Sequence, residues 1–218
     1  MVDLQNNKVL FISGIGTNVG KSFATGWLAK NLMAKGINVM TQKMIQTGNK
    51  NFSEDIDIHR KIMQIPYADV DNDNTTAPVI LSYPASPHLA ATIDKCDIDL
   101  NKINNATRNL SSKYDLILLE GAGGLMVPIK DQYLTIDYIC ENNYPVVLVI
   151  NGILGSINHA ILSLEALQSR NISLKYIIYN SYFDEDAIIA EDTRNYLKKY
   201  FSIKSPESDF LIMPKLDI

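Results

Sequence analysis

A glycine-rich segment, GIGTNVGKS (residues 14–22), follows a short apolar run and opens an amphipathic one. A strand, a glycine-rich turn and Lys-Ser at the start of a helix form a phosphate-binding loop, in which backbone N–H groups and the helix dipole face the phosphates. The strict spacing would put the first glycine at Ile15, and here it is displaced to Gly14. In such loops the lysine reaches the terminal phosphates and the hydroxyl binds Mg²⁺. We therefore predict that ATP is bound by Gly16, Thr17, Asn18, Val19, Gly20, Lys21 and Ser22.

A single carboxylate ends another apolar run, in YDLILLEGAGG (114–124). Glu120 would stand at the carboxyl end of a buried strand, where a carboxylate in a nucleotide-binding protein can hold Mg²⁺ directly or through water. The small residues after it, Gly123 among them, would let the backbone approach a ligand closely. The pattern predicts that Glu120 lies beside the phosphate loop.

Further polar residues follow the second apolar run, in QKMIQTG (42–48). Lys43 should emerge at the same sheet edge as Lys21, which would concentrate positive charge where phosphoryl transfer needs it. Downstream, Asp55 and Asp57 diverge on a helix, so only one of the two should face the site. His59 has no cysteine or histidine partner at metal-binding spacing, so we expect it on the surface.

Short apolar runs alternate with longer amphipathic ones along the whole chain. The apolar runs are typical of strands buried on both faces of a parallel sheet. The strands are expected at 9–13, 37–41, 116–119, 146–150 and 176–179, and the helices at 21–34, 56–63, 100–112, 136–142, 158–169 and 185–200. This alternation predicts an α/β fold with a doubly wound, mainly parallel sheet flanked by helices. The polar, proline-containing segment 66–87 is expected to be a loop excursion.

Length and composition limit the remaining possibilities. The 218 residues, with 46% hydrophobic and 20% charged residues, suit one domain spanning 1–218. A net charge of −4 without a basic run disfavours nucleic-acid binding, and the apolar runs are too short to span a membrane. The N-terminal segment lacks the basic and apolar regions of a signal peptide, and two cysteines cannot form a disulfide framework. We expect a cytoplasmic protein.

The ends of the later strands also carry polar residues. NGILGSINHA (151–160) leads from a strand into a helix N-terminus, which suits an anion. Asn180 ends the strand after that, and an asparagine can pair with a purine edge through both its donor and its acceptor. Asparagine is also a common turn residue.

Taken in order, GIGTNVGKS, QKMIQTG, SPH (86–88), LEGAGG, LGSINHA and YNS resemble the dethiobiotin synthetase family, from about residue 9 to Asn180 with a weaker match at Met213-Pro214. The resemblance implies a P-loop ligase of biotin biosynthesis. Such an enzyme uses ATP and Mg²⁺ to carboxylate 7,8-diaminopelargonic acid with CO₂ and close the ring, and it acts as a homodimer.

The resemblance also implies roles for particular residues. Lys21 and Lys43 would be catalytic. Ser22, Glu120 and one of Asp55 or Asp57, with Asp57 preferred, would bind the metal. Asn180 and Pro214 would contact the adenine. Substrate would be bound by Thr17, Lys43, Thr47 and Gly123, and its carboxylate by the partner subunit through Leu154, Gly155, Ser156 and Asn158.

Two alternatives remain open at this stage. An ATP-switched assembly or positioning ATPase of the same superfamily usually carries a second loop lysine, where this chain has Gly16. A small-molecule kinase would often have an arginine-rich lid, and arginines are few here: Arg60, Arg108, Arg170 and Arg194.

Overall fold

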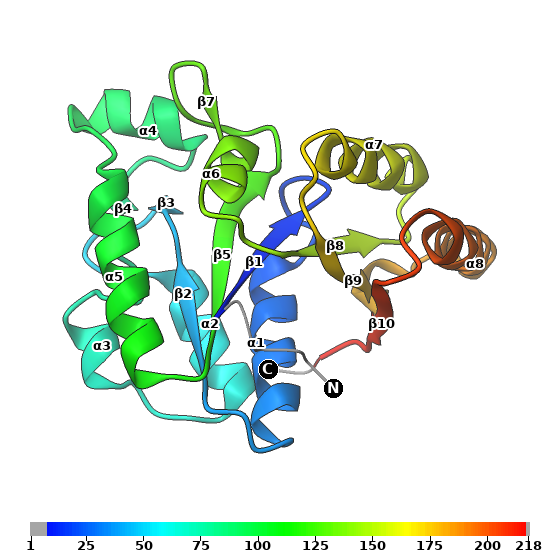
Figure 1. Ribbon diagram of the computed structural model, residues 1–218, viewed down its shortest axis with the longest axis horizontal. Coiled ribbons are helices and arrows are strands. Elements are labelled where there is room, and N and C mark those ends of the chain that lie inside the picture. The colour runs from blue at the N-terminus through cyan, green and yellow to red at the C-terminus, as the bar shows by residue number, and fades with distance from the viewer. Residues whose placement is uncertain (1–7, 217–218) are drawn as a thin grey trace.

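The computed structural model describes residues 8–216, and its centre is a six-stranded parallel sheet with the order β10-β9-β8-β1-β5-β2 (Figure 1). These strands are β1 (Val9–Gly14), β2 (Val39–Lys43), β5 (Leu116–Gly124), β8 (Val146–Asn151), β9 (Leu174–Asn180) and β10 (Asp209–Met213). All five neighbouring pairs are parallel. The predicted α/β class with a doubly wound parallel sheet is confirmed.

Helices cover both faces of this sheet, as runs of β-branched and aliphatic residues buried on both sides require. The helices α1 (Lys21–Met33) and α2 (Glu54–Met63) contribute to the apolar core on one face. The opposite core takes side chains from α5 (Leu100–Lys113), α6 (Thr135–Glu141), α7 (Ser156–Gln168) and α8 (Ala187–Lys204). Strand β8 lies between the two cores and is buried along its whole length.

Several short elements lie outside the sequence-based expectations. The 66–87 excursion is not all loop, because it holds α3 (Asp69–Asn72) and β4 (Ile80–Leu81), which pairs with β3 (Gln46–Thr47). Helix α4 (Pro87–Asp94), the antiparallel pair β6 (Pro128–Lys130) and β7 (Tyr133–Leu134), the short η1 (Ser181–Phe183) and the edge strand β10 were not predicted. Among the described helices, none combines the length and the apolar character needed to cross a membrane.

The sheet brings the carboxyl ends of β1, β2 and β5 together. The register places Glu120 beside Ile12 of β1 on one side and beside Lys43 of β2 on the other. Strands β5 and β2 lie on one side of β1, and the later strands β8, β9 and β10 lie on the other. Ligands of open α/β sheets bind beyond the carboxyl ends of the strands, at the point where the strand order reverses in this way. This edge is where the chemistry should be sought.

Candidate active site

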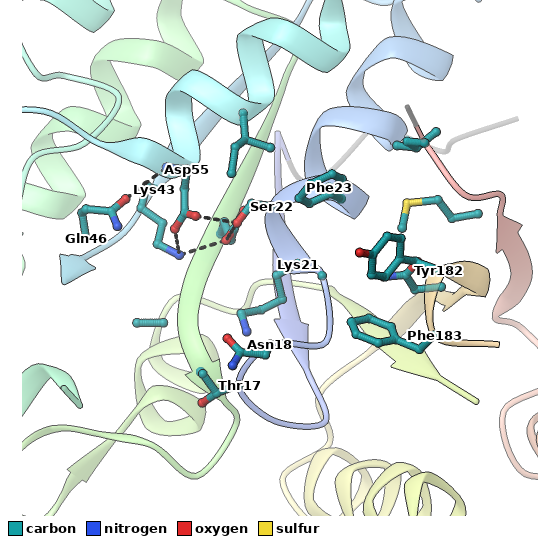
Figure 2. A pocket seen from close by; sticks show the side chains of 18 of the residues that line it. Thr17, Asn18, Lys21, Ser22, Phe23, Lys43, Gln46, Asp55, Tyr182 and Phe183 are labelled. Atoms are coloured by element: carbon teal, nitrogen blue, oxygen red, sulfur yellow. Dashed lines mark hydrogen bonds and ion pairs between the residues drawn. The ribbon is translucent and has the colours of Figure 1, made fainter. Parts of the chain in front are cut away.

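A cavity of about 750 Å³ opens at this carboxyl edge of the sheet. Its lining comes from the phosphate loop, the ends of β2 and β5, the first turn of α2, and the segments after β9 and β10. Figure 2 shows Lys21 and Ser22 in the middle, with Lys43 and Asp55 on one side and Tyr182 and Phe183 on the other. The predicted phosphate-loop residues other than Gly16 and Val19 therefore share one cavity with the predicted residues of β2 and β5.

The polar centre of the cavity is an ion-paired cluster around Lys43. Its Nζ lies 2.5 Å from Asp55 Oδ2 and 2.9 Å from Glu120 Oε1. The hydroxyl of Ser22 lies 2.6 Å from Asp55 Oδ1 and 3.0 Å from Glu120 Oε1. Three hard oxygen donors thus converge at the start of α1.

The charges in this cluster stabilise one another. Burial disfavours the charge on Lys43, but the carboxylates of Glu120 and Asp55 raise its pKa above the ordinary lysine value. Burial likewise disfavours the charge on Glu120, and Lys43 followed by a hydrogen bond from His59 lowers the pKa of that carboxyl. Both groups are therefore charged in the folded protein.

Lys21 differs from Lys43 because none of the carboxylates in residues 8–216 contacts it directly. Its Nζ donates to the carbonyl of Gly16 at 3.1 Å within the phosphate loop. Burial, followed by repulsion from Lys43, lowers the pKa of Lys21 to about 8. A bound phosphate would supply the negative charge that this ammonium lacks.

The choice of Asp57 as the site aspartate was wrong. Asp57 forms an exposed ion pair of 2.7 Å with Lys61, one turn further along α2. Asp55, two residues earlier, points into the cavity because α2 packs against α1 at Gly26, where an added Cβ would meet Ile62 at 3.0 Å. Ser53 caps α2 by accepting from the Ile56 N–H at 3.2 Å, which fixes where the helix starts.

The expectation of a surface position for His59 was also wrong. The ring is fully buried, with Nε2 2.8 Å from Glu120 Oε2 and Nδ1 3.1 Å from Thr41 Oγ1. Thr25, which sequence reasoning did not select, lies 2.9 Å from the same Oε2 atom. The available signal for Thr25 was its place one turn after Lys21, since side chains four apart share a helix face.

The far end of the cavity is formed by Asn180, Tyr182, Phe183 and the Met213–Leu216 segment, which includes Pro214. Asn180 Nδ2 donates to the Val19 carbonyl at 3.0 Å, and its Oδ1 accepts from the Tyr182 N–H at 3.1 Å. Gly20 has a φ of 84°, and an added Cβ there would lie 2.2 Å from the Asn180 amide nitrogen. Only glycine fits this junction of the phosphate loop with β9.

Thr17, Thr47 and Gly123 line the cavity as well. These residues also border an adjoining hollow of about 360 Å³, which reaches Ser86 and Pro87 at the start of α4. The SPH segment (86–88) is thereby placed next to the phosphate loop. Gly16 and Val19 shape the loop through their carbonyls, which accept from Lys21 and Asn180.

The LGSINHA segment does not reach this cavity in its own chain. Leu154 is 83% exposed, Gly155 and Asn158 are exposed, and the hydroxyl of Ser156 donates to Asn151 within the same loop. None of Leu154, Gly155, Ser156 and Asn158 lines the cavity. The expected helix N-terminus is present, because α7 begins at Ser156.

The comparisons with known proteins agree with this geometry. Residues 8–205 match the family model described as an AAA domain. The solved structure of a protein described as a plasmid partition protein, from Borrelia burgdorferi B31 with AMPPNP bound, covers 97% of this chain and 88% of its own. Its TM-score is 0.57 at 17% identity, which shows a shared fold alone.

Closer relatives identify the family. ATP-dependent dethiobiotin synthetase BioD 2 of Pasteurella multocida (strain Pm70) is 46% identical over 211 residues, covering 97% of this chain and 99% of the relative. The enzyme of the same name from Haemophilus influenzae (strain Rd) is 51% identical over 184 residues, covering 84% of this chain and 96% of the relative. With such identity over nearly the full length, the chain belongs to the family of ATP-dependent dethiobiotin synthetases.

Proposed function

We propose that this protein is an ATP-dependent ligase that converts 7,8-diaminopelargonic acid and CO₂ to dethiobiotin, with release of ADP and phosphate. The relatives that match over nearly their full length are named ATP-dependent dethiobiotin synthetases. The observation that carries the proposal is the convergence of Lys21, Lys43, Ser22 and two carboxylates in one cavity. Phosphoryl transfer depends on positioning and charge neutralisation, which this set of side chains supplies.

The proposed reaction has three bond-forming steps. One amine of the substrate attacks CO₂ and loses a proton, which gives a carbamate. A carbamate oxygen then attacks the γ-phosphorus of ATP, and ADP leaves. The second amine attacks the carbamate carbon, phosphate leaves with the C–O bond pair, and the loss of a proton completes the cyclic urea.

Lys21 and Lys43 would stabilise the transferred phosphoryl group. Lys43 is held by two carboxylates, so its ammonium is charged and fixed before substrate arrives. Lys21 lies in the phosphate loop, where an ATP phosphate would become its partner. Thr17, Thr47 and Gly123 line the part of the cavity where the diamine or its carbamate would bind.

The donor set at the start of α1 fits Mg²⁺. A hard cation prefers carboxylate and hydroxyl oxygens, and the hydroxyl of Ser22 lies 2.6 Å from Asp55 Oδ1 and 3.0 Å from Glu120 Oε1. The two carboxylates carry two negative charges, and Lys43 between them neutralises only one of these. Mg²⁺ bound there would neutralise charge on the ATP phosphates. Asp55 replaces Asp57 in this proposal.

The substrate carboxylate would be held by the loop at the start of α7 of a second subunit. This loop lies outside the cavity of its own chain and exposes Ile153 and Leu154. A helix N-terminus can bind an anion with backbone N–H groups and its dipole. We propose that the protein works as a cytoplasmic homodimer with two shared sites. Asn180 and Pro214 would border the adenine.

The test is phosphate release from ATP in the presence of bicarbonate, with and without the diamine, together with mass detection of the product. We expect phosphate release that depends on the diamine and equals the dethiobiotin formed. A phosphorylated diamine without ring closure would identify a kinase. ATP hydrolysis that is indifferent to the diamine would reject the synthetase activity.

A further inference from the structure

The two oxygens of Glu120 have different partners. Oε1 lies 2.9 Å from Lys43 Nζ and 3.0 Å from Ser22 Oγ, inside the cavity cluster. Oε2 lies 2.8 Å from His59 Nε2 and 2.9 Å from Thr25 Oγ1, on the protein side. One oxygen of the carboxylate is therefore available to a ligand in the cavity, and the other is held by contacts with His59 and Thr25.

The support continues behind His59 as a buried chain of hydrogen bonds. His59 Nδ1 lies 3.1 Å from Thr41 Oγ1, and Arg60 Nη1 lies 2.7 Å from the same hydroxyl. Arg60 in turn contacts both oxygens of Asp71, at 2.9 and 2.7 Å. His59, Thr41, Arg60 and Asp71 are each at most 7% exposed. No step of the proposed reaction uses them.

The direction of each hydrogen bond follows from the chemistry of the arginine. A guanidinium only donates, so Thr41 Oγ1 must accept from Arg60. Among the described residues, Thr41 Oγ1 has hydrogen-bond contacts only with Arg60 Nη1 and His59 Nδ1, so the hydroxyl proton has no acceptor there other than Nδ1 of His59. An imidazole that accepts at Nδ1 carries its proton on Nε2, and this proton points at Glu120 Oε2.

We propose that His59 is a positioning residue, locked by Thr41 and the Arg60–Asp71 pair in the tautomer that donates to Glu120, so that the other Glu120 oxygen faces the metal. The inference rests on the Mg²⁺ role assigned to Glu120 under the proposed function. The bidentate Arg60–Asp71 pair fixes the far end of the chain, and Thr76 Oγ1 also donates to Asp71 at 2.7 Å. Partners behind metal ligands typically set the ligand's orientation and its basicity.

The first test removes only the hydroxyl that sets the direction. Thr41→Val keeps the volume, and Thr41→Ser restores the hydroxyl. Thr107→Val is a matched control, since Thr107 is a buried threonine whose hydroxyl contacts Gln42 and the Ile103 carbonyl rather than His59 or Glu120. The measured quantity is the Mg²⁺ concentration that gives half-maximal binding of a non-hydrolysable ATP analogue, by calorimetry.

We expect Thr41→Val to need about tenfold more Mg²⁺, the lower end of the effects seen for such partners. Thr41→Ser and Thr107→Val should stay within about twofold of the wild type. Equal behaviour of Thr41→Val and Thr107→Val in folded protein would overturn the proposal. Nucleotide binding by the wild type that does not depend on Mg²⁺ would also overturn it.

The second test reads the tautomer directly, by long-range ¹H–¹⁵N correlation spectra of histidine-labelled wild-type protein. The sequence has three histidines, and His88 and His159 are exposed, so His88→Gln and His159→Gln assign the remaining signal to His59. A proton on Nε2 supports the proposal, and a proton on Nδ1 rejects it. This measurement decides the question even where Thr41→Val does not fold.

Neither readout involves the diamine. A wild-type protein without diamine-dependent phosphate release would reject the proposed function and leave the tautomer and Mg²⁺ results standing. Conversely, an active synthetase with the ring proton on Nδ1 would reject only the positioning role of His59.

Discussion

The cluster around Lys43 and the loop before α7 both lie where strands of the same sheet end, yet they are built in opposite ways. In the cluster, side chains from β2 and β5 are buried, those from α2 and α1 are partly buried, and all of them contact one another within one chain. In the loop, Leu154, Gly155 and Asn158 are exposed and do not reach the cavity. One subunit supplies all the side chains of the cluster proposed to bind the phosphates. The loop proposed to bind the substrate carboxylate does not reach the cavity of its own subunit.

This difference has a physical reason. Charge that develops during phosphoryl transfer is stabilised best by groups that are fixed beforehand, and a buried, fully paired cluster provides that. A carboxylate several bonds away from the reacting atoms needs only a binding surface. Such a surface can be contributed by a second subunit without loss of precision at the phosphate.

The largest expected effect comes from removing the lysine of the phosphate loop. Lys21→Ala should lower turnover by about 100-fold or more, because stabilisation of the transition-state charge is lost. Lys61→Ala, which removes an exposed lysine of α2, is the matched control and should leave turnover within about twofold. Steady-state rates with saturating diamine measure both. Retention of more than about a tenth of the wild-type rate, a loss below about 1.4 kcal/mol, would contradict the role of Lys21.

The next effect separates two neighbouring carboxylates of α2. Asp55→Asn should lower turnover by about tenfold or more and raise the Mg²⁺ requirement, since an amide is a poorer ligand for a hard cation and a poorer partner for Lys43. Asp57→Asn loses only an exposed pair with Lys61 and should change turnover by less than about twofold. A Mg²⁺ titration of the rate compares the two variants. Equal effects would remove the distinction between the faces of α2.

Mixing two inactive variants tests whether the loop before α7 completes the site of a second subunit. Lys21→Ala and Ser156→Trp should each be inactive alone. After random exchange about half of the dimers are heterodimers, and one of the two sites in each heterodimer combines an intact phosphate loop with an intact partner loop. Activity should therefore return in about a quarter of all sites. Subunit exchange is followed with differently tagged chains. Absence of recovery after proven exchange would place both functions in one chain, as would full activity of an isolated monomer.

The smallest expected effect is a pH dependence of the free protein. Burial, followed by the charge of Lys43, lowers the pKa of Lys21 to about 8. Its ammonium is present below that pH and is lost as the pH rises, so the affinity for ATP should fall between pH 7 and 9 by at most about tenfold. Calorimetry at constant ionic strength measures the affinity, and Lys21→Met should abolish this fall. A wild-type affinity that is flat over this range would show that Lys21 keeps its charge.

The sequence allowed the sheet and most of the phosphate end to be predicted, because both depend on local patterns. Apolar runs located five strands within a few residues, and the glycine-rich turn located Lys21 and Ser22. Strand β10 was missed although residues 210–213 form a continuous apolar run, and unlike the central strands it is a partly exposed strand at the edge of the sheet. Helix α4 lies in a stretch whose prolines favoured a loop.

The errors at the site concern which face of α2 packs inward. The pairing of Asp57 with Lys61 four residues later is an exposed helix pattern that could have excluded Asp57. His59 could not be recognised in this way, because a polar residue on a buried helix face is explained only by its partners. Those partners, Glu120 and Thr41, come from two other elements of the chain.

The contact between Gly20 and Asn180 has a consequence for engineering the nucleotide preference. The Asn180 side-chain amide donates to the Val19 carbonyl and accepts from the Tyr182 N–H, so any substitution at position 180 alters the phosphate loop together with the end of the cavity proposed for the adenine. Libraries that vary this position would mix lost catalysis with changed base selectivity. Tyr182, Phe183 and Lys215 border the same end of the cavity, and the side chain of Lys215 lies over the Tyr182 ring. Diversification at these three positions leaves the hydrogen bond between Asn180 and the phosphate loop in place.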